Sequence, residues 1–430
     1  MTVPPRALRL LVVIFIAAAP AVALRATCEG RACDGRDRAS AEAPFCSLPP
    51  RVRKLIEHGF REGRAPDILG VTGKVLLSTG EGVRWPSTSD PATEVPIVFS
   101  GAGVDPDAEV PSGTRVDAIA PTLADILRLR RPHPEVRSGR AIEGVASVGR
   151  PRLVLLVALK GVGGSEALEL ESLQDLLSRG AGTRAGDAGS LPVDPVAVMT
   201  SIGTGGLPYQ HGMIASRIRT DEGHLAPAWG RRSPVSVIAA LGDDLDGQLD
   251  QRPLIGVAGT EAGDRGLIGR NWYLDADKDQ VILGRNAVRA AEELLARGFG
   301  ADRTPDLLAV ALEGTTGEMD VDLRRLMALA TRRARGSATV VVVGTGSPAR
   351  RGSVPDAGVV KAIEAELPGP APVIASPSAG GFFLDQRTVS REHIAQDEIL
   401  DAMRATRSPS GDRLFADLFS GFAVSFARYC

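Results

Sequence analysis

The chain has few of the residues that bind nucleic acid. Aromatic residues make up 4% of its 430 residues, and its formal net charge is -2 at pH 7. Binding to nucleic acid requires a basic surface and, for single strands, rings on which bases stack. No nucleic-acid partner is therefore expected. Hydrophobic residues reach 43%, as in ordinary globular proteins, and the length allows one large or two ordinary domains.

Histidine and cysteine are also scarce. There are five histidines and four cysteines. None of the histidines pairs with another at the spacing of metal ligands, and no cysteine–histidine group has zinc-site spacing. The sequence therefore predicts no metal site from these residues.

The N-terminus has the pattern of a secretory signal peptide. Arg6 and Arg9 precede an apolar run over residues 10–19, and Ala21-Val-Ala23 resembles a cleavage site. We expect a signal peptide over residues 1–23, a linker over 24–45, and an exported protein, periplasmic or secreted. The run is short for a membrane span and is followed by Pro20, so no stable span is expected after cleavage. An uncleaved anchor is the alternative.

Apolar strands alternate with amphipathic helices along most of the chain. Such alternation predicts an α/β fold, with a mostly parallel central sheet and helices on both faces. The main predicted strands cover residues 66–72, 95–100, 153–159, 252–258, 306–313, 338–343, 372–376 and 380–385, the last as a hairpin or edge strand. The predicted helices cover 50–63, 119–127, 165–177, 235–241, 286–297, 321–333, 359–367 and 392–403, and aromatic residues in 414–429 are expected to be buried.

Several of these segments together resemble the alkaline phosphatase superfamily, especially its phosphodiesterase and nucleotide-pyrophosphatase branch. The first strand, 153–159, is followed by Thr200-Ser-Ile-Gly-Thr-Gly and by Leu207-Pro-Tyr-Gln-His-Gly. Residues 306–313 and 338–343 are similar to the family's two central strands. Residues 95–101 and 116–127 are similar to its closing section. The resemblance covers most of residues 46–430.

The order of these segments differs from the family. The segment 46–150 matches the family's C-terminal part, whereas 151–430 matches its N-terminal and central part. The resemblance thus implies a circular permutation within one compact domain, 46–430. It also implies that Cys46 and Cys430 are near neighbours, which makes them disulfide candidates; Cys28 and Cys33 are further candidates. Two separate half-like domains are the alternative, but these would expose the edges of a parallel sheet.

The family's chemistry uses two divalent metals, held by Asp and His, and a Thr or Ser nucleophile. Here Lys160 stands in the slot of the first ligand Asp, and Pro195 in that of the nucleophile. The segments 314–319 and 344–347 lack the expected Asp and His. The resemblance therefore implies a non-catalytic phosphoester hydrolase fold that retains an anion or ligand pocket, with no catalytic residue, no metal and no cofactor. The candidates to line this pocket are Lys160, Pro195, Glu313, Thr315, Thr316, Glu318, Thr345 and Ser347.

Lys160 suggests how such a pocket is maintained. A lysine in the slot of a metal ligand would place a cation in the metal's stead, and Glu313 would pair with it. The ordinary alternative is a lysine that points to solvent.

Three other functions are compatible with the sequence. An active hydrolase, with zinc or another divalent metal, would use the carboxylates Asp194, Glu313, Glu318 and Asp320. A nucleotide-binding protein would use the loop 161–164, which follows a strand, although the third glycine of the dinucleotide fingerprint is missing. A binding module would hold an anion on the glycine loops 203–206 and 344–346, with Arg350 and Arg351 nearby. The two arginines could equally be a solvated pair. The sequence does not identify a partner.

Overall fold

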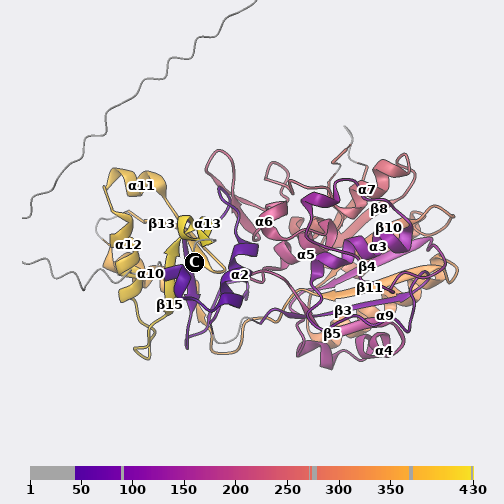
Figure 1. Ribbon diagram of the computed structural model, residues 1–430, viewed down its shortest axis with the longest axis horizontal. Helices are drawn as coiled ribbons and strands as arrows, with labels where there is room; N and C mark the ends of the chain where they lie inside the picture. The colour runs from indigo at the N-terminus through magenta and orange to yellow at the C-terminus, as the bar shows by residue number, and fades with distance from the viewer. Residues whose placement is uncertain (1–43, 89–91, 271, 274–277, 368–370, 428–429) are drawn as a thin grey trace, which may run out of the picture. The chain divides into compact units, whose positions relative to one another are not determined.

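A seven-stranded sheet forms the centre of the fold, in the order β5-β3-β11-β4-β10-β8-β9 (Figure 1). The computed structural model describes residues 44–430 except 89–91, 271, 274–277, 368–370 and 428–429. The predicted signal peptide, Cys28 and Cys33 lie outside these residues, as does the predicted linker except for its last two residues.

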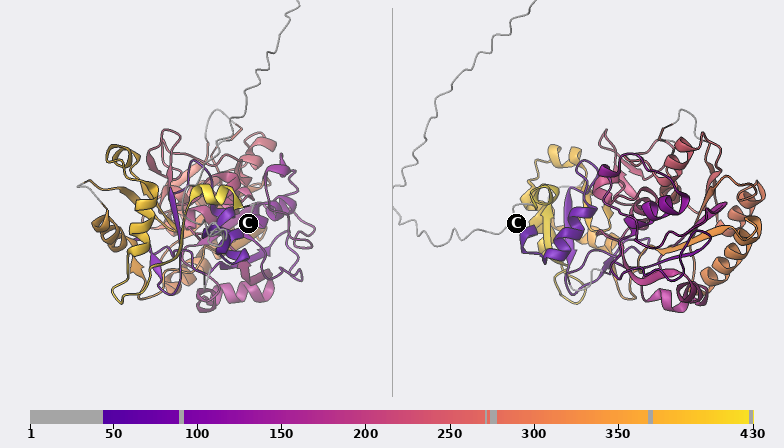
Figure 2. Two further views of the ribbon diagram at one scale, coloured as in Figure 1. Left: turned by 60° about the vertical axis from the view of Figure 1, so that its left-hand side comes forward. Right: turned by 45° about the vertical axis from the view of Figure 1, so that its right-hand side comes forward.

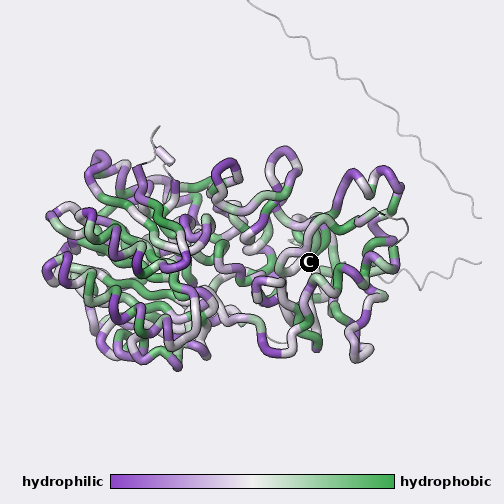
Figure 3. Tube along the Cα trace, turned by 180° about the vertical axis from the view of Figure 1, so that it is seen from behind, coloured by the Kyte–Doolittle hydropathy of each residue, from purple (hydrophilic) through white to green (hydrophobic). Residues whose placement is uncertain are grey.

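Three fully buried strands lie at the middle of this sheet: β4 (Leu153–Leu159), β10 (Asp306–Leu312) and β11 (Ala338–Gly344). They are parallel to one another and to β8 (Ile255–Gly259) and β9 (Gln280–Leu283). A continuous apolar run is what a strand covered on both faces requires. Figure 3 shows these hydrophobic strands and the hydrophilic loops that join them.

Helices cover both faces, which confirms the predicted mixed α/β class. Alternate side chains of β4 enter two separate cores, because successive side chains of a strand point to opposite faces. One core contains residues of α3 (Ile119–Leu127) and α5 (Pro195–Thr204). The other contains residues of α4 (Glu171–Arg179), α8 (Ala287–Ala296) and α9 (Thr316–Arg333).

Strands from distant parts of the chain share both larger sheets. β3 (Glu94–Gly101) runs antiparallel between β11 and β5 (Ala181–Asp187). β1 (Ile68–Thr72) lies between β14 (Gly381–Leu384) and β15 (Phe415–Ser420), and β13 (Ile374–Ser378) completes this second sheet. Both sheets therefore combine strands from before and after residue 150, and the described residues belong to one compact unit that ends at Cys430.

The disulfide between Cys46 and Cys430 is present, as the sequence predicted. Their Cα atoms lie 5.2 Å apart, although 384 residues separate them in sequence. The segment with α1 (Pro44–Ser47) and α2 (Pro50–Gly59) lies beside the C-terminal segment with α13 (Gly421–Ser425) in both views of Figure 2. Phe45 packs edge-on against Phe419 of β15, with ring centroids 5.0 Å apart.

The other elements are short or flank the two sheets. They are β2 (Leu77–Ser78), η1 (Val116–Ala118), η2 (Pro134–Val136), η3 (Glu166–Glu169), α6 (Pro208–His211), β6 (Arg217–Arg219), β7 (Leu225–Pro227), α7 (Leu241–Gln248), η4 (Ala262–Leu267), β12 (Val354–Pro355), α10 (Asp356–Glu366), α11 (Gln386–Arg391) and α12 (Gln396–Ala405). Within the described part of the chain, none of the helices has the length and apolarity to span a membrane.

Several sequence predictions about local structure are wrong. Residues 235–240 are not helical, because α7 begins only at Leu241. Of the two alternatives for 380–385, the hairpin is confirmed, since β14 pairs antiparallel with β13 through Ser378 and Gly381, whereas the edge strand is wrong because β14 lies inside its sheet. Near the C-terminus Phe415 and Phe419 are buried, but Phe422 is 70% exposed. The predicted loop 203–206 begins inside α5: a Cβ at Gly203 would lie 2.2 Å from the carbonyl oxygen of Gly266, so this glycine permits close packing of α5 against η4.

Candidate functional site

The carboxyl ends of four central strands meet at one edge of the sheet, where ligands of such folds bind. Lys160 follows β4, Glu313 follows β10, Thr260 follows β8 and Thr345 follows β11. Together they line a cavity of about 510 Å³, which we call the carboxylate cavity. Its other charged or polar lining residues are Glu81, Asp194, Ser216, Glu261 and Ser347.

Lys160 does not point to solvent; its side chain is only 8% exposed. Its Nζ lies 2.6 Å from Oε1 of Glu261, 2.7 Å from Oδ1 of Asp264 and 3.7 Å from Oε2 of Glu313. It also donates a hydrogen bond of 3.2 Å to Oγ1 of Thr260. The expected pairing with Glu313 is thus present, but it is the longest of the three ion pairs.

The two closest partners of Lys160, Glu261 and Asp264, were not singled out from the sequence. Asp264 is fully buried, and its Oδ2 accepts hydrogen bonds from the backbone N–H of Thr260 at 2.7 Å and of Glu261 at 3.1 Å. These bonds hold the turn after β8 in place. The sequence contains only a weak signal for them: both lie within a few residues after the predicted strand 252–258, Glu261 before η4 and Asp264 within it.

The charge of Lys160 is stabilised by its surroundings. Burial alone would lower the pKa of this lysine, but the negative charges of Asp264 and Glu261, and their hydrogen bonds to the ammonium, outweigh it and raise the pKa. The ammonium is therefore charged at neutral pH and forms the cationic centre of the cavity.

The slot expected for a nucleophile has no hydroxyl. Pro195 occupies the first turn of α5, and Asp194 caps this helix. Oδ1 of Asp194 accepts from the N–H of Val196 at 2.9 Å, and Oδ2 accepts from the N–H and Oγ of Ser216 at 3.1 and 3.2 Å. Complete burial nevertheless raises the pKa of Asp194 to about 6.

Two hydroxyls near Pro195 in sequence, those of Thr200 and Ser201, form hydrogen bonds inside the core. Oγ1 of Thr200 donates to the carbonyl of Val196 at 2.8 Å. Oγ of Ser201 donates to the carbonyl of Ala197 at 3.1 Å and lies 3.0 Å from Nε2 of His211. Thr200, Ser201 and Ser190 are all buried and do not line the carboxylate cavity.

Three of the eight candidate pocket residues lie elsewhere. Thr315 and Glu318 form a capping box at the start of α9, in which Oγ1 of Thr315 donates to Oε2 of Glu318 at 2.8 Å. Thr316 donates to Oε2 of Glu169 at 2.7 Å. The other five, Lys160, Pro195, Glu313, Thr345 and Ser347, line the carboxylate cavity.

The carboxylates proposed for an active hydrolase do not gather in one place. Asp194 and Glu313 line the carboxylate cavity, whereas Glu318 caps α9. Asp320 accepts from the N–H of Ser172 at 2.6 Å and pairs with Arg324. Among the residues that the structure describes, no group of three or more His, Cys, Asp or Glu is arranged to hold a metal ion.

The loop 161–164 does not offer its N–H groups to a phosphate. The N–H of Gly161 donates to Oγ1 of Thr345 at 3.3 Å, that of Gly163 to Oε2 of Glu166 at 2.9 Å, and that of Gly164 to the carbonyl of Glu94 at 3.2 Å. In the loop 344–346, the backbone N–H of Thr345 donates to the carbonyl of Leu159, and that of Gly346 donates to the carbonyl of Val162. Neither glycine loop therefore has the free donors that the nucleotide and anion hypotheses require.

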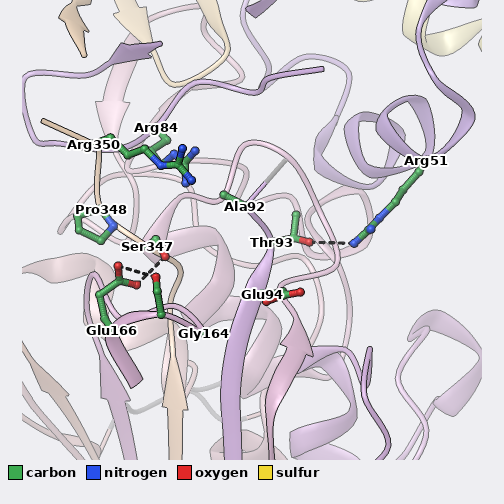
Figure 4. A pocket seen from close by; sticks show the side chains of 11 residues that line it. Arg51, Arg84, Ala92, Thr93, Glu94, Gly164, Glu166, Ser347, Pro348 and Arg350 are labelled. Atoms are coloured by element: carbon green, nitrogen blue, oxygen red, sulfur yellow. Dashed lines mark hydrogen bonds between the residues drawn. The ribbon is translucent and has the colours of Figure 1, made fainter. Parts of the chain in front are cut away.

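A second cavity shares Ser347 and Pro348 with the first. Figure 4 shows the side chains that line this second cavity. Its volume is about 370 Å³, and we call it the arginine cavity. Arg350, a predicted anion-binding residue, lines it, whereas Arg351 lines neither cavity. The full lining consists of Arg51, Arg84, Ala92, Thr93, Glu94, Gly164, Ser165, Glu166, Ser347, Pro348 and Arg350.

Comparison with known proteins yields only distant similarity. No protein-family model and no curated protein matches the chain. Among solved structures, the chain is similar to wild-type alkaline phosphatase PafA, with 12% identity, a TM-score of 0.46, and coverage of 64% of this chain and 85% of that one. A PafA mutant with four substitutions gives 11% identity, a TM-score of 0.44 and coverage of 64% and 86%. At this level the likeness says nothing about activity.

Proposed function

We propose that this protein is an exported, non-catalytic relative of phosphoester hydrolases, whose crevice binds a ligand without hydrolysing it. The observation that supports this most is the ammonium of Lys160, buried between Asp264 and Glu261 at the end of β4. A cation that belongs to the chain lies at the strand end where the family that the sequence resembles holds a metal.

The residues present do not fit the two divalent metals of that family. The Lys160 ammonium lies within 4 Å of all three carboxylates that face it, at 2.6, 2.7 and 3.7 Å, and would repel a divalent cation placed among them. Asp194, the buried carboxylate that lines the cavity, already accepts hydrogen bonds from α5 and from Ser216. We therefore derive no metal-dependent step for this chain.

The site also lacks the hydroxyl nucleophile that covalent catalysis of this kind requires. Pro195 has no hydroxyl, and the nearby hydroxyls of Thr200 and Ser201 are bonded within α5. A nucleophile must lie within hydrogen-bond reach of its base and of the reacting atom. This arrangement supports binding rather than covalent chemistry.

The permutation and the export are part of the same proposal. β3 precedes β4 in sequence but lies inside the central sheet, and Cys46 and Cys430 bring the two ends together. Closure of the two ends is what a permuted chain requires. A disulfide of this kind is typical of proteins in oxidising compartments.

A turnover assay tests the proposal. The purified protein is incubated with p-nitrophenyl phosphate and bis(p-nitrophenyl) phosphate, with Zn²⁺, Mg²⁺ or Mn²⁺ and without added metal. We expect no release of nitrophenol above that of Asp194→Asn and Glu313→Gln prepared in the same way, which controls for contaminating phosphatases. Metal-dependent turnover that is lost in either variant would overturn the proposal.

A further inference from the structure

The disulfide between Cys46 and Cys430 lies at the surface, where thiols can reach it. Cys430 is exposed and Cys46 is half-buried, although the bond joins residues that are 384 positions apart in sequence. Exchange with a thiol requires access to one of the two sulfurs, and a disulfide inside a core is protected from it. Cys430 therefore offers the side from which a thiol can attack.

This bond anchors a helix that is shared by two parts of the fold. Cys46 lies in α1, and α2 begins at Pro50, shortly after α1 ends. The buried side chains of α2 pack in one core with Leu191, with β1 and with β15 of the second sheet (Figure 1). The disulfide thus fixes the chain just before a helix on which both the second sheet and the segment at Leu191 rest.

The helix α2 is bonded to the segment that leads from β5 to α5. The N–H of Leu191 donates to the carbonyl of Leu55 at 2.9 Å, and Nδ1 of His58 donates to the carbonyl of Gly189 at 2.8 Å. A Cβ at Gly59 would overlap the carbonyl oxygen of Leu191, so the absence of a side chain allows the two backbones to approach this closely. The position of residues 189–191 therefore depends on that of α2.

The same segment continues into the wall of the carboxylate cavity. Val193, Asp194 and Pro195 line this cavity. Asp194 caps α5 by accepting from the N–H of Val196 at 2.9 Å, and Val193 also packs against the core that contains α2. A displacement of α2 would therefore move the cap of α5 and one wall of the cavity.

We propose that the Cys46–Cys430 disulfide is a redox-sensitive clasp, whose reduction loosens α2 and with it the wall of the carboxylate cavity at Val193 and Asp194. The reductant is a dithiol. One of its sulfurs, as the thiolate, attacks Sγ of Cys430, which breaks the S–S bond and releases Cys46 as a thiolate. The second sulfur then attacks the mixed disulfide and releases Cys430. The dithiol becomes a disulfide, and the two cysteines take up its two protons.

This clasp goes beyond the proposed function, because it would act on the cavity wall in the same way whether the cavity binds a ligand or hydrolyses one. Its test therefore needs no ligand, and its failure would leave the proposed absence of turnover untouched.

The test is hydrogen exchange of the intact protein, measured by mass spectrometry before and after incubation with dithiothreitol. We expect residues 187–196 to exchange about tenfold faster after reduction, whereas β10 remains protected, because loss of the clasp opens the structure locally. Cys46→Ser/Cys430→Ser should exchange like the reduced wild type and should not respond to dithiothreitol. Cys28→Ser/Cys33→Ser is the matched control and should respond as the wild type does.

A second variant tests the coupling through α2 with the disulfide intact. Gly59→Ala places a Cβ against the carbonyl oxygen of Leu191 and should push α2 away from it, so residues 187–196 should exchange faster even in the oxidised protein. Gly358→Ala in α10 is the control, since a Cβ there meets nothing within 4 Å, and it should leave the exchange of this segment unchanged.

Two results would overturn the inference. The first is equal exchange of residues 187–196 in the oxidised and reduced protein. The second is equal acceleration of this segment and of β10, which would make the disulfide a support of the whole fold rather than a clasp on the cavity wall. Exchange in Gly59→Ala that matches the wild type would contradict the coupling through α2. Re-formation of the bond with oxidised glutathione should restore the slow exchange, and failure to do so would contradict a reversible clasp.

Discussion

The carboxylate cavity and the arginine cavity share Ser347 and Pro348, but the cations that line them differ in their exposure to solvent. In the first, Lys160 is 8% exposed and is held by Asp264 and Glu261. In the second, Arg51 is 67% exposed and its Nη2 lies 3.5 Å from Oδ2 of Asp187. A buried cation needs its counter-charges close by, whereas an exposed cation is solvated and depends little on its partner.

The largest effect is expected from breaking the buried pair. Lys160→Met leaves the fully buried Asp264 without its cation. Removal of one partner of a buried ion pair costs about 3–5 kcal/mol, so the free energy of unfolding in urea should fall by about this amount. Lys361→Met, at an exposed position of α10, is the control and should change stability little. A loss as small as that of the control would show that Lys160 does not stabilise the cavity.

The next effect concerns alkaline pH. The pKa of Lys160 is raised in the folded protein above its ordinary value of 10.5, so its contribution to stability is complete below pH 10.5 and is lost as the pH rises through the folded-state value. The difference in unfolding free energy between the wild type and Lys160→Met should be constant from pH 8 to 10. Above pH 10.5 it should shrink by about 1.4 kcal/mol per pH unit. A difference that stays constant to pH 12 would contradict this.

A smaller effect should follow from restoring an acid. Lys160→Asp would place a fourth carboxylate near Glu261, Asp264 and Glu313, a set of oxygen ligands suited to hard cations. We expect millimolar Ca²⁺ or Mn²⁺ to raise the free energy of unfolding of this variant by about 1.5–2 kcal/mol. This is the gain expected when the metal concentration is about ten to thirty times the dissociation constant. The stability of the wild type should not change. The measurement is the unfolding temperature of each protein with and without the metal. An equal shift in both proteins would contradict the hypothesis that the Lys160 ammonium takes the place of a metal ion.

The smallest effect is expected at the rim of the same cavity. Glu313 is 60% exposed and its Oε2 lies 3.7 Å from Nζ of Lys160. Since exposed ion pairs contribute little, Glu313→Gln should lower stability by less than about 1 kcal/mol. A loss comparable to that of Lys160→Met would mean that Glu313, rather than Asp264, is the principal partner of the lysine.

The sequence predicted those parts of the fold in which periodicity and burial agree. β4, β10 and β11 are continuous apolar runs, and α3 was predicted with its exact bounds. Helix α5 was missed because all residues from Val196 to Thr204 are buried. A helix surrounded by protein has no polar face, so the 3.6-residue pattern that identifies a helix is lost.

The candidate site was predicted in part, for a related reason. Lys160, Glu313 and Thr345 directly follow strands whose limits the sequence shows clearly. Glu261 and Asp264 lie about one hundred residues after Lys160, in a turn and a short 3₁₀ helix that have no periodicity of their own. Arg51 and Arg84 reach the arginine cavity from outside the central sheet, and only the tertiary structure brings them to Arg350.

The most direct test of the central claim is the metal content of the purified protein after incubation with excess Zn²⁺ and removal of unbound metal, measured together with phosphodiester turnover. If the Lys160 ammonium serves as the cation of the site, the protein should retain far less than one zinc per chain and show no turnover. One or two zinc ions per chain, with turnover that is lost when EDTA removes them, would contradict the account.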